Sequence, residues 1–180
     1  SVSGLWRLSN ESFIRQYKWV DNLALRLSYG LQGNIDKGTS PFLVGKYDNV
    51  NILPGYSEEN IIINSAPNSK LRWEKTASYN LGMDFSVLNQ AINLSVDYYY
   101  RKGTDLIGSK ALALENGFTN MSINWASMEN KGVEINLQTR NITTKNFSWY
   151  TTFNFAYNQN KVLKVLTDKS QVTPSLEGYP

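Results

Sequence analysis

The segment from Ala77 to Lys102 constrains the fold most, because it alternates apolar and polar residues on both sides of a turn signal. Alternation with a period of two is typical of a β-strand with one apolar and one polar face. A tight turn at Asn89-Gln90 sets apolar residues opposite one another, and a slip by one residue would destroy the match. The expected pairs are Val87 with Ile92, Phe85 with Leu94, Met83 with Val96, and Leu81 with Tyr98. The sequence therefore predicts a β-hairpin.

Other segments alternate in the same way and are separated by polar connections. Strands are predicted at residues 1–8, 22–33, 71–88, 91–102, 131–140 and 147–158. Polar turns are expected at 9–21, which includes one short helical turn, and at 141–145. Long connections are expected at 34–70, which includes a short strand at 61–63, and at 103–130. Residues 161–180 are expected to be a loop. The predicted fold class is all-β, an antiparallel up-and-down meander of about six long strands within one domain segment.

The strand lengths and connections are typical of part of a transmembrane β-barrel. Strands of about ten residues exceed the usual five or six and suit a tilted crossing of the hydrocarbon layer. Such barrels have short turns on one side and long loops on the other. The apolar faces of the five strongest strands are expected to carry no charge, as a lipid-facing surface requires. Aromatic residues near the strand ends fit membrane-interface girdles. They are Trp6, Tyr29, Tyr98, Tyr100, Trp149 and Tyr157.

The polar faces carry the charged candidates Arg26, Asp84, Asp97 and Glu134. In a barrel these side chains would line a hydrated lumen and tune its field. The diagonal relation of Asp84 to Asp97 also fits a glycosidase carboxylate pair. An ion-paired wall explains the same residues, because Arg26 lies on the same face. We expect the ion-paired wall and no enzyme activity.

The composition excludes several kinds of site. The 180 residues include no cysteine and no histidine, so disulfides, thiol chemistry, imidazole triads and His/Cys zinc sites are absent. The net charge is +3, and the lysines and arginines are scattered, which gives no nucleic-acid footprint. No glycine-rich phosphate fingerprint precedes a helix, so no cofactor is expected. The mean hydropathy of −0.40 indicates no transmembrane helix but does not exclude a β-barrel, where only alternate residues face lipid.

Aromatic residues in the predicted long connections are candidates for substrate contact. Tyr47, Tyr56, Phe118 and Trp125 are suited to stacking on sugar rings. Packing of the connections against each other explains the same residues. The alternation also fits a soluble carbohydrate-binding β-sandwich, which has one buried and one wet face. A sandwich is less favoured, because its strands would recur every 8–12 residues.

Six stretches of the sequence match, in order, stretches of one known family. They are Leu27–Asn34, Ala66–Thr76, Asn80–Phe85, Ile92–Tyr99, Glu129–Ile135 and Asn154–Val162. Together they resemble SusC/RagA-type, TonB-linked outer-membrane transporters. The clearest is Ala66–Thr76, whose sequence APNSKLRWEKT is similar to the family's NPNLKWEKT, although Ala66 and Ser69 depart from it. The order of Gly4-Leu5 before Trp6 is inverted relative to the family.

The resemblance implies a section, toward the C-terminal part, of a plugged barrel of about 22 strands. It further implies the outer membrane of a Gram-negative bacterium, a SusD-like surface lipoprotein as partner, and contact with the TonB complex through an N-terminal region outside this sequence. Glycans or oligosaccharides, or peptides in some members, would be the cargo. The short turns would face the periplasm, and the connections at 34–70 and 103–130 would face outward. An isolated section would form an open or curled sheet with unpaired edges.

Overall fold

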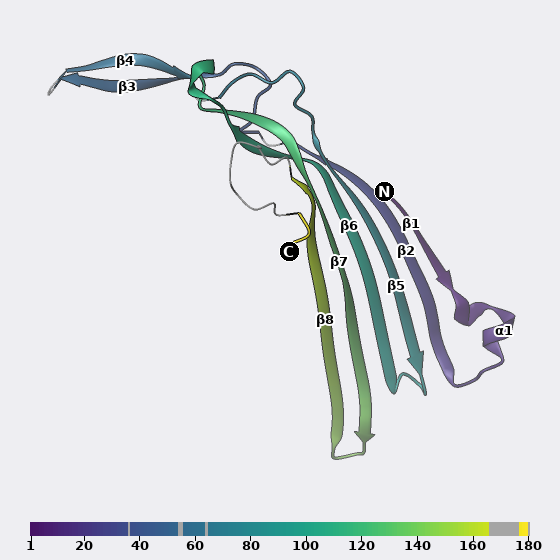
Figure 1. Ribbon diagram of the computed structural model, residues 1–180. Helices are drawn as coiled ribbons and strands as arrows, with labels where there is room; N and C mark the ends of the chain where they lie inside the picture. Colours follow the sequence, from purple (N-terminus) through teal and green to yellow (C-terminus); the bar gives the residue numbers. More distant parts are fainter. Residues whose placement is uncertain (36, 54–55, 64, 166–176, 180) are drawn as a thin grey trace.

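A single antiparallel sheet of six strands dominates the computed structural model, which describes residues 1–35, 37–53, 56–63, 65–165 and 177–179. The strands follow one another in the order β1-β2-β5-β6-β7-β8 (Figure 1). They are β1 Val2–Arg7, β2 Val20–Asn34, β5 Glu74–Val87, β6 Ile92–Ala111, β7 Asn120–Thr143 and β8 Ser148–Val165. The predicted antiparallel meander is therefore confirmed.

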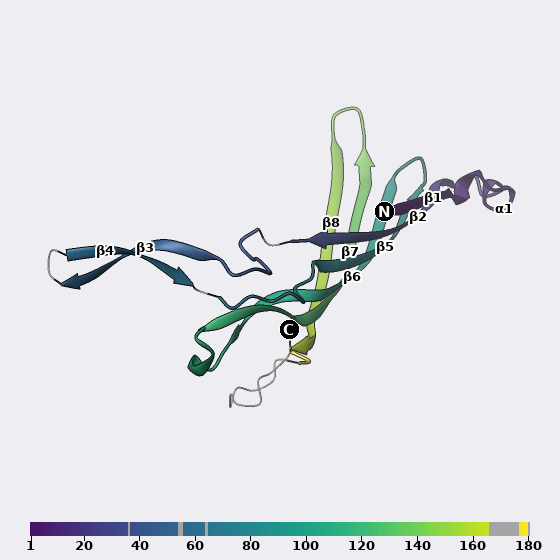
Figure 2. The same ribbon diagram turned by 90° about the horizontal axis from the view of Figure 1, so that it is seen from above.

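A second, two-stranded sheet consists of β3, Gly45–Leu53, and β4, Tyr56–Ile63. This hairpin projects away from the large sheet in both views (Figures 1 and 2). Short helices lie in the connections: η1 Leu8–Asn10, α1 Ser12–Arg15 and η2 Leu114–Asn116. In the described ranges, no helix has the length and apolar character needed to cross a membrane.

The pairing of β5 with β6 confirms the register that the sequence predicts. Val87 lies opposite Ile92, and each of the other three apolar pairs is also observed. The turn is closed by a hydrogen bond of 3.2 Å that the Ala91 amide donates to the Leu88 carbonyl. Asn89 and Gln90 have φ angles of 55° and 59°. Positive φ at both central positions is the requirement of a type I′ turn, whose twist matches that of the flanking strands.

The connection predicted at 103–130 is wrong in its bounds. β6 continues to Ala111 and β7 begins at Asn120, so only residues 112–119 join them. The register shifts between Gly103 and Leu106 and again between Leu106 and Ile107. Such bulges insert extra residues and interrupt the alternation on which the strand prediction depends.

Two other boundaries also differ from the prediction. The connection at 34–70 contains β3 and β4, although a strand was expected only at 61–63. β8 extends to Val165, so the loop predicted at 161–180 is wrong for residues 161–165, and residues 166–176 and 180 lie outside the described part. Residues 178 and 179 pair with the end of β8. The Gly178 amide donates to the Val162 carbonyl at 2.8 Å, and the Val162 amide donates to the Tyr179 carbonyl at 3.0 Å.

The large sheet is a single layer, and the described residues form no conventional hydrophobic core. Among the described residues, the only buried apolar side chains are Ala24 and Val87. On the apolar face, Leu27 is 62% exposed and Phe153 is 55% exposed. A β-sandwich would bury this face against a second sheet, so the alternative of a sandwich is wrong. Among the described strands, β1 and β8 form the two edges and do not pair with each other, which confirms the expected open sheet.

Candidate functional site

The polar face of the sheet brings the four charged candidates together. Arg26 on β2 lies opposite Gly82 on β5, Gly82 lies opposite Asp97 on β6, and Asp97 lies opposite Glu134 on β7. Residues directly opposite in an antiparallel sheet point to the same side. Asp84 follows two positions after Gly82 and therefore shares this side. The predicted common face for these residues is thus present in the structure.

Arg26 connects three strands through two ion pairs. Its Nε lies 2.8 Å from Asp84 Oδ2, and its Nη2 lies 3.0 Å from Asp97 Oδ1. The Ser95 hydroxyl lies between the two carboxylates, at 3.1 Å from Asp84 Oδ1 and 3.3 Å from Asp97 Oδ2. One guanidinium and one hydroxyl therefore serve both carboxylates. This arrangement supports the ion-paired wall over the glycosidase pair.

Gly82 allows Arg26 to reach across β5. A Cβ atom on Gly82 would lie 2.5 Å from Asp97 Oδ1 and 2.8 Å from Arg26 Cζ, closer than van der Waals contact permits. The absence of a side chain therefore lets the guanidinium pass over β5 and reach β6. Sequence reasoning missed this role, because it depends on a register between strands that are distant in the chain.

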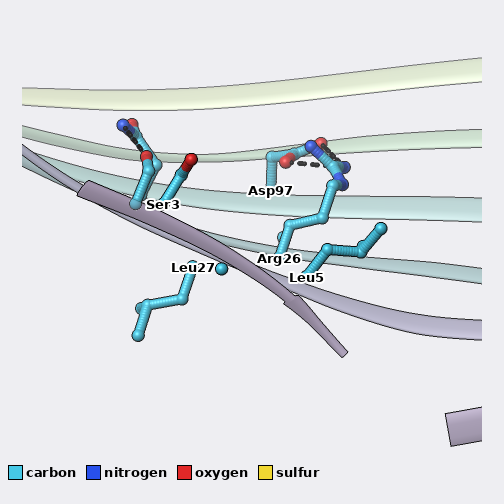
Figure 3. A pocket seen from close by; sticks show the side chains of 9 residues that line it. Ser3, Leu5, Arg26, Leu27 and Asp97 are labelled. Carbon is cyan, nitrogen blue, oxygen red and sulfur yellow. Dashed lines mark hydrogen bonds and ion pairs between the residues drawn. The ribbon is translucent and has the colours of Figure 1, made fainter. Parts of the chain in front are cut away.

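A shallow hollow of about 430 Å³ lies beside this ion-paired cluster (Figure 3). Arg26 and Asp97 contribute charge to its lining, and Leu5 points toward the same side as Arg26, whereas Leu27 points to the opposite side (Figure 3). Ser3, Ser28 and Asn80 add polar groups. The lining mixes polar and apolar groups, and its two charged side chains are already paired with each other. It suits weak contact with a hydrated solute.

We predict a small, salt-dependent coupling between Arg26 and Asp97. Both side chains are about 40% exposed, with values of 43% and 39%, so solvent screens their attraction. A double-mutant cycle with Arg26→Gln and Asp97→Asn should give a coupling of about 0.2–1 kcal/mol in urea titrations. The coupling should fall in 1 M salt, where the Debye length is roughly 3 Å. A coupling that is unchanged by salt would contradict this prediction.

The apolar face ends in a row of tyrosines. Tyr29, Tyr79 and Tyr100 lie opposite one another on β2, β5 and β6. Their ring centroids are 4.8 Å apart for the first pair and 6.1 Å for the second. Tyr79 was missed as an interface candidate, although it belongs to the alternating segment from which the hairpin was predicted.

Charged residues begin at this tyrosine row, so the prediction of an entirely uncharged apolar face is wrong at the end of the sheet farther from the β5–β6 turn. Lys131 lies opposite Tyr100, and Lys102 and Glu129 form the next pair. The Tyr100 hydroxyl donates a hydrogen bond of 3.0 Å to Glu129 Oε2. A phenol with an apolar ring and a bonded hydroxyl suits the boundary between an apolar and a wet environment.

The other predicted interface aromatics occupy separate places on the face. Tyr98 on β6 and Tyr157 on β8 both lie opposite Val133 of β7, one on each side of it. Trp149 lies opposite Ile142 near the β7–β8 turn. Trp6 lies near the end of β1, and its Nε1 donates to Glu11 Oε1 at 3.0 Å. Their role at a membrane interface stays a prediction.

The four predicted substrate-contact aromatics come from different elements. Tyr47 lies on β3 and is 72% exposed, whereas Phe118 lies in the β6–β7 connection. The backbone of Tyr56 begins β4, and its side chain lies outside the described part. Trp125 was expected in a loop but lies in β7, where its ring covers Gly108 of β6. Packing therefore accounts for Trp125.

A hydrogen-bond network around Asn124 and Glu74 connects the stretch before β5 to β6 and β7. Asn124 Oδ1 accepts from the Arg72 amide at 2.7 Å, and its Nδ2 donates to the carbonyls of Arg72 and Asp105, both at 2.6 Å. The carboxylate of Glu74 accepts from the Ile107 amide at 2.9 Å and from Asn34 Nδ2 at 2.9 Å. Arg72 and Glu74 belong to the APNSKLRWEKT stretch, whose hydrogen-bonding role was not anticipated.

We predict that Asn124→Ala destabilises this hydrogen-bond network. Three hydrogen bonds are lost and backbone groups are left without their partner, which costs about 1–3 kcal/mol. Hydrogen exchange should accelerate at residues 72 and 105–107. Asn116→Ala is the matched control, because the Asn116 side chain donates within its own turn, from Nδ2 to the Ala113 carbonyl at 3.0 Å. Equal acceleration of hydrogen exchange in both variants would contradict a stabilising role for the Asn124 network.

Comparisons with known proteins place this architecture. The family model "TonB dependent receptor-like, beta-barrel" matches residues 5–180. TonB-dependent receptor P39 of Formosa agariphila is 34% identical over 165 residues, which cover 89% of this chain and 15% of that protein. TonB-dependent receptor SusC of Bacteroides thetaiotaomicron is 31% identical over 165 residues, which cover 89% of this chain and 16% of that protein.

Solved structures agree with the sequence relatives. The RagAB peptide importer in its closed-closed state matches with a TM-score of 0.75 and 27% identity, covering 92% of this chain and 18% of that chain. The present chain spans roughly one sixth of the length of the curated relatives it matches, between 15% and 17%. Since the family match covers nearly all residues, the chain belongs to the TonB-dependent receptor-like β-barrel family.

Proposed function

We propose that the chain forms one section of the wall of an outer-membrane, TonB-linked importer in a Gram-negative bacterium. The observation that carries this proposal is the single-layer sheet with an uncovered apolar face and an ion-paired polar reverse. A lipid environment would cover the apolar face without a second sheet. The polar face, with Arg26, Asp84, Asp97 and Glu134, would line the hydrated lumen. The role of the wall is passage and gated binding rather than bond chemistry.

In this proposal, the end of the sheet that carries the short turns faces the periplasm. The β5–β6 turn and the β7–β8 turn lie at the same end as α1, whereas the β3–β4 hairpin and the β6–β7 connection lie at the other (Figure 1). Short periplasmic turns and longer outer loops are the usual pattern of such barrels. The outer end would then present Tyr47 and Phe118 to cargo.

The cargo that we propose is a glycan or oligosaccharide, with a peptide as the alternative. Exposed aromatic side chains at the outer end suit stacking on sugar rings, and Tyr47 is 72% exposed. The similarity to the RagAB peptide importer favours the alternative. The partners would be a SusD-like surface lipoprotein at the outer end and the TonB complex, reached through a region outside this sequence.

Cysteine labelling of the full-length receptor tests the orientation of the two faces. The chain contributes no cysteine, and any cysteine elsewhere in the receptor is first replaced by serine, so each single replacement reports on its own position. Asn80→Cys and Leu81→Cys are a matched pair, because these neighbours point to opposite sides of β5. In intact outer membranes, a small water-soluble maleimide should label position 80 and spare position 81, whereas both should react after denaturation. Equal labelling in the membrane would exclude the lipid-facing assignment.

Uptake and purification test the cargo and the partner. A strain lacking the full-length receptor should lose growth on one oligosaccharide as carbon source and keep growth on peptides. Affinity purification of the receptor in mild detergent should recover a lipoprotein encoded nearby. The opposite growth pattern would establish the peptide alternative, and normal growth on both would remove the importer proposal.

A further inference from the structure

The turn between β1 and β2, residues 8–19, differs from the other turns at the same end of the sheet. The β5–β6 and β7–β8 connections are tight hairpin turns, whereas this β1–β2 turn contains η1 and α1 (Figure 1). Three aromatic residues in it are largely exposed: Phe13 at 53%, Tyr17 at 46% and Trp19 at 52%. The turn therefore presents an aromatic surface where the neighbouring turns are compact.

The aromatic surface of the β1–β2 turn continues the apolar face of the sheet. Trp19 packs edge-on against Phe85 of β5, with ring centroids 6.4 Å apart and an interplanar angle of 88°. Tyr17 packs against Trp19 at 6.3 Å and 63°. The Leu88 amide donates to the Trp19 carbonyl at 3.0 Å, which fixes the backbone beside the β5–β6 turn. Phe85 belongs to the apolar face, so this stack extends that face past the ends of the strands.

Within residues 8–19, the cations Arg15 and Lys18 exceed the single acid, Glu11, by one charge. Arg15 and Lys18 are exposed, and neither takes part in an ion pair among the described residues. The two nearby acids have other partners. Glu11 Oε1 accepts from Trp6 Nε1 at 3.0 Å, and Asp21 Oδ2 accepts from the Gln90 amide at 2.9 Å. Among the described residues, no carboxylate therefore neutralises either cation.

We propose that the β1–β2 turn binds an anionic phospholipid, with its phosphate at Arg15 and Lys18 and its acyl chains along Trp19 and Phe85. Two observations support this occupant. The aromatic stack is continuous with the lipid-facing side of the sheet, and the adjoining cations complement a phosphate charge. Aromatic rings with polar tips favour the headgroup level of a bilayer. The inference rests on the proposed membrane orientation and adds a specific lipid site to it.

Native mass spectrometry of the full-length receptor tests this lipid site. The detergent-purified receptor is titrated with an equimolar mixture of phosphatidylglycerol and phosphatidylcholine that carry identical acyl chains. The wild type should retain phosphatidylglycerol preferentially. The variant Arg15→Gln/Lys18→Gln should lose on the order of fivefold in phosphatidylglycerol retention for each cation removed, with phosphatidylcholine retention unchanged. Trp19→Ala should lower the retention of both lipids, because it removes the apolar part of the site.

Two controls make the result specific to this turn. Lys145→Gln removes a cation from the β7–β8 connection, at the same end of the sheet, and should leave the lipid preference unchanged. Arg15→Lys/Lys18→Arg keeps both charges and should also preserve it, which separates loss of charge from misfolding. Inorganic phosphate in millimolar excess should not displace phosphatidylglycerol.

Three outcomes would overturn the lipid site. They are an unchanged preference in the charge-removed variant, an equal loss in Lys145→Gln, and displacement by inorganic phosphate, which would indicate a simple anion site. The labelling of positions 80 and 81 does not depend on lipid charge. A receptor that passes that labelling test but shows no lipid preference therefore refutes this inference alone.

Discussion

Leu25→Lys should lower the stability of the membrane-inserted receptor by about 2–4 kcal/mol, the cost of a lysine at the midplane of a bilayer. Leu25 lies on the apolar face, between Trp6 of β1 and Met83 of β5, and this row lies between the tyrosine row and the turns. In the proposed orientation an ammonium group there has no water and no partner carboxylate. Urea titration of the receptor folded into phospholipid vesicles would measure the loss.

Leu31→Lys is the matched control on the same strand and the same face. Leu31 is 64% exposed and lies opposite Ala77, beyond the tyrosine row, where charged residues already occur. Its replacement should cost only about 0–1 kcal/mol, the value for a position near the interface. Equal costs at the two positions would mean that the apolar face has no depth profile, and the membrane assignment would fail.

Gly132→Ala should destabilise the sheet by about 1–3 kcal/mol through overpacking. A Cβ atom at this position would lie 2.5 Å from the Tyr157 carbonyl oxygen of β8 and 2.6 Å from the Tyr99 ring of β6. The backbone oxygen has no freedom to move away without breaking the β7–β8 pairing. Tyr99 lies over the bare glycine, an arrangement that shields a strand glycine. The loss would be measured by the same urea titration.

Gly4→Ala is the control for the destabilisation expected in Gly132→Ala. The space around Gly4 is open, with no heavy atom within 4 Å of an added Cβ. Alanine restricts the unfolded chain, so the change should be neutral or stabilising by about 0.4–1 kcal/mol. A similar destabilisation in both variants would show that strand glycines matter here through backbone freedom, not through close approach to Tyr99 and Tyr157.

The sequence was sufficient for the features that depend on neighbours along the chain. The β5–β6 hairpin and its register follow from alternation and one turn, and the structure agrees pair by pair. The common face of Arg26, Asp84, Asp97 and Glu134 follows from the same periodicity. Alternation fails where bulges occur, which is why the ends of β6 and β7 were missed. At Asp105, φ is 57°, a local backbone conformation that residue patterns alone do not reveal.

Features that depend on pairing between distant strands could not be predicted. Gly82 is informative only once Arg26 and Asp97 are known to flank it on neighbouring strands. The bonds of Asn124 to Arg72 join residues 52 positions apart. The resemblance of the APNSKLRWEKT stretch to a family motif marked Arg72 and Glu74 as part of a shared sequence but gave no reason for it. In this chain, both residues belong to the hydrogen-bond network around Asn124 and Glu74.

A sheet that forms a single layer limits which insertions and deletions its gene can tolerate. Because almost no described side chain is buried, each side chain between two bulges would face lipid or lumen in the proposed barrel according to whether its position is odd or even. Loss of a single codon within β2 would therefore reverse every later side chain of that strand, whereas loss of two would shorten it and preserve the assignment. Length variation among relatives should accumulate in the connections at 35–73 and 112–119, and within strands it should occur in steps of two codons.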